Sequence, residues 1–190
     1  VSALLYAVLA VAPIATIVIG ICNWAITQVY PPSRLPRLEL KDGIPEEFRT
    51  MVIIPTLLTS EARVRELVEQ MEVFYLANRE ERLHFALIGD FKDGDREHET
   101  DDEGIIQVAI QEVRRLNDKY GDDIFFYFHR YRQFNPSQKQ WMGWERKRGA
   151  LVEFNRLLRG DSATSYYIKE GNLSILPRIK YVITLDADTQ

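Results

Sequence analysis

Two aspartates follow an apolar run near residue 190, in the sequence YVITLDADTQ. Asp186 and Asp188 are separated by one residue, so their carboxylates can share one divalent cation, directly or through water. Oxygen ligands of this kind suit Mg²⁺ or Mn²⁺, which bridge phosphate groups in many sites. The pair therefore predicts a metal site for a phosphorylated ligand. An ordinary solvated loop is the alternative, because Asp-x-Asp is a common pattern.

A basic cluster lies upstream, in the sequence WERKRGALVEFNRLL. Arg146, Lys147 and Arg148 precede Gly149 near the start of a helix predicted at 145–159. Backbone amides at a helix start and basic side chains both favour anions, so the cluster can hold a pyrophosphate. Positive charge at a helix start is otherwise unfavourable, and a bound anion would explain it. The alternative is a solvated helix face.

Three further residues are candidates for a binding site. Asp90 follows an apolar run in LIGDFKDG, so it would lie at the end of a strand. Trp141 and Trp144 precede the basic cluster. They either line a sugar or base site or are aromatic residues of the core.

Alternating strands and helices must position these residues. Short apolar runs predict strands, and apolar residues at helical spacing predict helices. The predicted strands are 51–55, 83–91, 124–131 and 180–185, and the predicted helices are 60–80, 100–121 and 145–159. This alternation is typical of an α/β fold with a parallel sheet, in which ligands gather outside the carboxyl ends of the strands.

Local signals mark where the predicted helices begin and end. Ser60 is a suitable N-cap, and Thr100 with Glu103 has the spacing of a capping box. Gly121 and Gly160 are suitable stop signals.

The first part of the chain predicts a membrane span. Residues 3–29 carry no charged side chain, and as a helix they would be roughly 40 Å long, more than the roughly 30 Å of a bilayer core. The predicted organisation is therefore a transmembrane helix at 1–30, a juxtamembrane linker at 31–49 and a soluble domain at 50–190. Basic residues in the linker predict that the domain is cytoplasmic; they are Arg34, Arg37, Lys41 and Arg49.

Composition excludes some classes of protein. The single cysteine, Cys22, excludes an internal disulfide, and the net charge of −4 gives no sign of nucleic-acid binding. Because the chain begins with Val1, within an apolar run, and reaches Gln190 inside a predicted site, we expect it to be a fragment of a longer protein.

Four segments together resemble a known family. MVIIPTLL, LIGDFKDG, WERKRGALVEFNRLLRG and YVITLDADTQ, in this order after an apolar helix, resemble the glycosyltransferase region of bacterial cyclic β-1,2-glucan synthases. That region is related to processive GT-A transferases such as cellulose synthase. The resemblance covers nearly all of 50–190, and its third segment is the most specific. It implies a GT-A (Rossmann-like) nucleotide-sugar-binding half-domain after a transmembrane helix, in the bacterial inner membrane.

The resemblance also implies an activity. Such an enzyme transfers glucose from UDP-glucose to a growing β-1,2-glucan acceptor, with inversion and with Mg²⁺ or Mn²⁺. Its membrane helix would pack against other transmembrane helices of the full-length protein. The catalytic base is expected downstream of Gln190, so the fragment alone should be inactive.

Site residues follow from the same resemblance. Asp90 would contact the uracil, and Thr56 would lie beside the nucleotide. Lys147 and Arg148 would lie near the phosphates. Asp186 and Asp188 would hold the metal, with Asp186 also binding the sugar diphosphate.

Two alternatives remain open. One is a membrane-anchored α/β module with a degenerate nucleotide site and a role in assembly. The other is a phosphatase of the haloacid dehalogenase type, which also has Asp-x-Asp after a strand. The phosphatase pattern requires threonine where this chain has Gln190. It also places the motif on the first strand of the core, whereas three predicted strands precede the motif here.

Overall fold

The structure is a computed structural model that describes residues 2–30, 40, 43–121 and 123–187. Asp188, most of the predicted linker and several of its basic residues lie outside the described residues. The chain divides into two compact units, Val1–Glu39 and Leu40–Gln190. The first contains helix α1 (Ser2–Val29), which confirms the predicted apolar helix. Among the described residues, this helix is long and apolar enough to cross a membrane.

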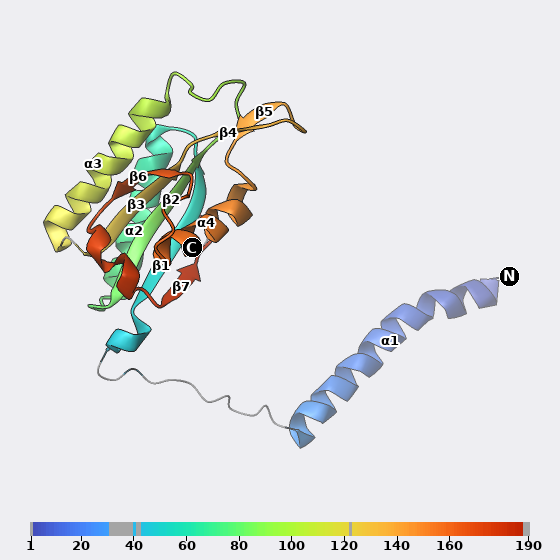
Figure 1. The fold of residues 1–190 in the computed structure, drawn as a ribbon. Coiled ribbons are helices and arrows are strands. Elements are labelled where there is room, and N and C mark those ends of the chain that lie inside the picture. Colours follow the sequence, from blue (N-terminus) through green and yellow to red (C-terminus); the bar gives the residue numbers. More distant parts are fainter. Residues whose placement is uncertain (1, 31–39, 41–42, 122, 188–190) are drawn as a thin grey trace. The chain divides into compact units, whose positions relative to one another are not determined.

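The second unit is built on a five-stranded sheet (Figure 1). The strand order is β6-β3-β2-β1-β7. Strands β1, β2, β3 and β7 are parallel, whereas β6 is antiparallel to β3. The bounds are Thr50–Leu58 for β1, Leu83–Phe91 for β2, Phe125–Arg130 for β3, Tyr166–Glu170 for β6 and Tyr181–Thr184 for β7. The four predicted strands and the mostly parallel sheet are therefore confirmed.

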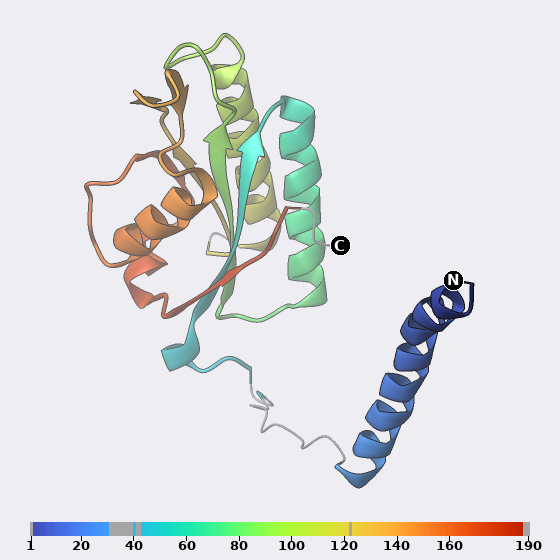
Figure 2. The same ribbon diagram turned by 90° about the vertical axis from the view of Figure 1, so that its right-hand side faces the viewer.

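Helices cover both faces of this sheet, as Figure 2 shows. On one face lie α2 (Glu61–Ala77) and α3 (Asp102–Tyr120), and on the other lie α4 (Arg146–Leu158) and the 3-10 turn η2 (Leu173–Arg178). Each face has its own apolar core, because successive strand residues point to opposite sides of a sheet. Val52 packs with the α2 and α3 side, and Ile53 packs with the α4 side.

Most predicted helix ends are confirmed. The Ser60 hydroxyl accepts a hydrogen bond from the amide of Arg63, 3.2 Å away, and α3 is followed by Gly121 at φ +129°. The capping box at Thr100 was wrong, because α3 begins after Asp101 with no side-chain cap. The Asp102 carboxylate instead accepts from the amide of Glu99 at 2.8 Å.

The sequence patterns did not indicate several short elements. Strands β4 (Gln133–Asn135) and β5 (Gln140–Met142) form a small antiparallel hairpin. Each has three residues, too few to show an alternating pattern. The 3-10 turn η1 (Glu46–Phe48) precedes β1, and the edge strand β6 lies in a region without a clear pattern.

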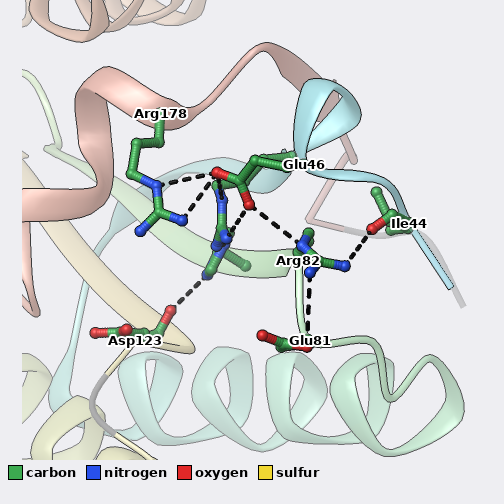
Figure 3. A network of polar contacts seen from close by, with 8 residues as sticks. Ile44, Glu46, Glu81, Arg82, Asp123 and Arg178 are labelled. Carbon is green, nitrogen blue, oxygen red and sulfur yellow. Dashed lines mark hydrogen bonds and ion pairs between the residues drawn. The ribbon is translucent and has the colours of Figure 1, made fainter.

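An ionic network lies at the amino-terminal ends of strands β1 and β2 (Figure 3). The Glu46 carboxylate accepts hydrogen bonds from Arg49 at 2.6 Å, Arg82 at 3.2 Å and Arg178 at 2.9 Å. These arginines come from the start of β1, the start of β2 and the end of η2. The hydrogen bond from Arg49 is the largest cause that lowers the pKa of Glu46 to about 2; desolvation opposes it, and the hydrogen bond from Arg178 adds to the lowering. The network thus ties the segment entering β1 to two other elements.

Candidate functional site

A pocket of about 290 Å³ lies at the carboxyl ends of β1 and β2, against the start of α4. Three of the predicted substrate-binding residues, Thr56, Asp90 and Lys147, line it together. The complete lining is Pro55, Thr56, Leu57, Ile88, Asp90, Arg146, Lys147 and Ala150. The pocket therefore combines an apolar wall with a carboxylate and two cations, at the edge where parallel α/β sheets bind ligands.

Asp90 is held by a buried arginine. Its side chain is paired with Arg130 at the end of β3, with Nε to Oδ1 at 2.7 Å and Nη2 to Oδ2 at 2.5 Å. Burial raises the pKa of Asp90 above its usual value, and the hydrogen bonds from Arg130 oppose that rise. Because parallel strands β2 and β3 are neighbours, their ends place the Asp90 carboxylate opposite the Arg130 guanidinium. The fork of the guanidinium fixes the orientation of the carboxylate beside the pocket.

Arg130 also binds the segment that carries the basic cluster. Nη1 donates to the backbone carbonyl of Trp144 at 2.9 Å and to the Glu153 carboxylate at 3.1 Å. Nη2 donates to the carbonyl of Arg146 at 3.0 Å. Glu153 in turn accepts hydrogen bonds from the amide and the hydroxyl of Ser165. One fully buried guanidinium thus joins β2, β3 and the start of α4 beneath the pocket.

The chain enters α4 through an unusual backbone conformation. Glu145 and Arg146 have φ values of +51° and +47°, in the left-handed region that non-glycine residues rarely adopt. A Cβ on Gly143 would lie 2.8 Å from Arg130 Nη2, and one on Gly149 would lie 1.8 Å from the carbonyl oxygen of Trp144. Glycine is therefore required at both positions for this close wrapping. The hydrogen bonds from Arg130 hold the strained residues in place.

Lys147 reaches from the pocket to the first aspartate of the Asp-x-Asp pair. Its ammonium group forms an ion pair with the carboxylate of Asp186, and both side chains are at least half exposed. The carboxylate oxygens of Asp186 are thus accessible beside the pocket, as those of a Mg²⁺ or Mn²⁺ ligand must be. Within the described ranges, no group of three or more acidic, histidine or cysteine side chains is gathered for a metal. Asp188, the second predicted ligand, lies outside those ranges.

The other predicted residues lie apart from this pocket. Arg148 does not line the pocket; 80% of its side chain is exposed, and its Nε lies 3.8 Å from the Glu145 carboxylate. Its neighbour Arg146 lines the pocket instead. Trp141 and Trp144 are not in the buried core, and 39% of Trp144 is exposed.

Sequence reasoning missed Arg130 and Glu153, which organise the site. The available signal was that Arg130 ends the aromatic strand FFYFHR. A cation buried at the end of such a strand needs an acidic partner. The identity of the partners could not be read from spacing. Asp90 precedes Arg130 by 40 residues, and Glu153 follows it by 23.

Comparison with known proteins supports the resemblance derived from the sequence. No protein-family model matches the chain. Over 174 residues, or 90% of its length, the chain is 42% identical to the cyclic beta-(1,2)-glucan synthase NdvB of Rhizobium meliloti (strain 1021). This similarity confirms the resemblance to cyclic β-1,2-glucan synthases. The chain spans only 6% of the length of that protein.

Proposed function

We propose that the chain is the donor-binding part of a membrane-bound glycosyltransferase of the GT-A type, which uses UDP-glucose to extend a β-1,2-glucan with inversion. The observation that carries the proposal is the pocket in which Thr56, Asp90 and Lys147 converge, in a chain 42% identical to a cyclic glucan synthase. Helix α1 would anchor the enzyme in the bacterial inner membrane, with the globular unit in the cytoplasm.

The pocket has a suitable place for each part of UDP-glucose. The apolar wall and Thr56 would contact the nucleoside. Arg130 uses two of the roughly four lone-pair positions of the Asp90 carboxylate. The remaining ones can accept the N–H of uracil. Lys147 and Arg146 would face the phosphates, because ammonium and guanidinium groups bind phosphate oxygens.

Asp186 and Asp188 would hold Mg²⁺ or Mn²⁺ at the diphosphate. The metal, when bound, would supply positive charge for the UDP leaving group. Lys147 would stabilise the same developing charge from the protein side. An ion pair keeps Lys147 and Asp186 together. A bound metal diphosphate would therefore take the place of a contact that already joins these two side chains.

Calorimetric titration tests this function. UDP and UDP-glucose would be titrated into the full chain in lipid nanodiscs, with and without Mn²⁺. We expect metal-dependent binding that Asp188→Ala abolishes, whereas Asp90→Asn weakens uridine binding and leaves metal binding unchanged. Asp118→Asn is the matched control, because Asp118 is exposed on α3 and lines no described pocket.

Equal UDP affinity in wild type, Asp188→Ala and Asp90→Asn would reject the site. Absence of binding by a folded wild-type chain would favour a degenerate module with a role in assembly.

A further inference from the structure

A second cavity, of about 470 Å³, lies between the β4–β5 hairpin and the start of α4. Two aromatic side chains in its lining are open to solvent, with Phe134 51% exposed and Trp144 39% exposed. Figure 1 shows the hairpin beyond the carboxyl ends of the central strands, near the start of α4. The full lining is Gln133, Phe134, Asn135, Pro136, Gln138, Met142, Trp144, Glu145 and Arg146.

Hydrogen bonds attach the hairpin to the neighbouring segments. Trp141 exchanges two backbone hydrogen bonds with Gly94, both 2.9 Å long. Arg146 donates to the Asp93 carboxylate at 2.7 Å and to the Gln138 side chain at 3.4 Å. The cavity is thus bounded by three segments that are bonded to one another. A preformed cavity of this kind is typical of a binding site for a small ligand.

The side chains of the cavity match a neutral ligand with many hydroxyl groups. Exposed aromatic faces can stack on the C–H faces of sugar rings, and the carboxamides of Gln133 and Gln138 can donate to and accept from hydroxyls. Glu145 and Arg146 bring opposite charges, so the cavity favours neither an anion nor a cation. An apolar ligand would leave these polar groups without partners.

The cavity adjoins the donor pocket. Arg146 lines both, and Trp144 and Lys147 lie in one continuous turn at the start of α4. We propose that the cavity is a glucan-binding subsite, in which Phe134 and Trp144 stack on glucosyl units of the chain being extended. The choice of glucan as ligand rests on the proposed function. The subsite would keep the glucan beside the donor pocket between successive transfers.

Tryptophan fluorescence gives a direct test. The chain has three tryptophans. Trp144 lines the cavity and Trp141 packs against Phe134, with the ring centroids 5.6 Å apart, so a Trp24→Phe background leaves two reporters at or next to the cavity. The full chain with this substitution would be placed in lipid nanodiscs, because sugar-based detergents would compete. Linear β-1,2-gluco-oligosaccharides would be titrated, and UDP with Mn²⁺ would be titrated into the same sample.

We expect a saturable fluorescence change with the oligosaccharide, and an affinity about tenfold lower in Phe134→Ala, because a stacking contact is lost. Tyr167→Ala is the matched control, since Tyr167 is 44% exposed on β6 and lines neither cavity. Phe134 is exposed, so its truncation leaves the core intact.

The outcomes separate the two proposals. UDP binding without a saturable response to oligosaccharide, or an unchanged affinity in Phe134→Ala, would overturn the glucan subsite and leave the donor pocket standing. Oligosaccharide binding that depends on Phe134, without UDP binding, would support the subsite and overturn the donor pocket.

Discussion

Asp90 and Arg130 face each other from the ends of two neighbouring parallel strands, joined by hydrogen bonds of 2.7 Å and 2.5 Å. Asp90 lines the candidate donor pocket, whereas Arg130 lies behind it with its side chain fully buried. The arginine also holds the backbone from which Lys147 projects. The two sides of the pocket are therefore positioned by one buried guanidinium.

Replacing Arg130 should be strongly destabilising. Arg130→Met would leave the carboxylates of Asp90 and Glu153 buried without their cation, so we expect the free energy of unfolding to fall by about 3–5 kcal/mol. Chemical denaturation measures this change. Arg114→Met is the control, because the ion pair of Arg114 with Glu170 has a solvent-exposed arginine and should contribute at most about 1 kcal/mol. Similar losses in the two variants would contradict a special role for Arg130.

Gly149→Ala should disturb the start of α4. Its Cβ would lie 1.8 Å from the carbonyl oxygen of Trp144, so the backbone that Arg130 holds must move. We expect at least a tenfold loss of UDP affinity, which corresponds to about 1.4 kcal/mol, together with lower stability. Gly104→Ala in α3 is the helical control. Its Cβ would meet only the flexible end of Glu61 at 3.2 Å, so UDP affinity should be unchanged.

Phe126→Ala should destabilise the α4 side of the core without touching either cavity. Phe126 is 0% exposed and stacks on Phe128 at a centroid distance of 6.3 Å. A loss of about 3–5 kcal/mol is expected for a buried phenylalanine replaced by alanine. Thermal unfolding followed by circular dichroism measures it, with the exposed Phe134→Ala as reference. A loss below about 1 kcal/mol would mean that this core is not packed as described.

Glu46 should make stability depend on pH in the acid range. Its pKa is about 2 when folded, lowered chiefly by the hydrogen bond from Arg49, against 4.5 for the free group. A lowered pKa means that the folded state favours the charged form. This contribution is therefore fully present above about pH 4.5 and is lost as the pH falls through 2.

Glu46→Gln checks that window. The stability difference between wild type and the variant should be constant near neutral pH and should shrink progressively below pH 4.5. A difference that does not change between neutral and acid pH would show that the ion pairs of Glu46 do not stabilise the fold.

Much of the fold could be predicted from local patterns, because the residues of a buried strand are apolar and those of an amphipathic helix are apolar at helical spacing. The apolar run around Ile53 and the spacing of Val64, Leu67 and Val68 are examples, and all are buried as expected. The capping box at Thr100 failed for a tertiary reason. Asp102 is fixed by the buried Arg132 at 2.5 Å, which sets where α3 begins.

The candidate site was predictable only in part. Thr56, Asp90 and Lys147 occupy the ends of elements, so topology alone brings them to one edge of the sheet. Arg146 lines the pocket in place of the predicted Arg148. This outcome depends on the left-handed backbone at Glu145, which no local pattern encodes. The hairpin cavity depends on contacts between Gly94 and Trp141, which are distant in sequence.

The shared guanidinium also constrains how such a protein can diverge. Replacing Arg130 leaves two buried carboxylates without their cation, whereas replacing Asp90 or Glu153 leaves Arg130 paired with the other acid. A lineage that lost Arg130 before the two acids would pass through a poorly folded ancestor. Arg130 should therefore be kept as long as Asp90 or Glu153 is present, whereas the exposed Phe134 of the hairpin can vary at little cost to the fold.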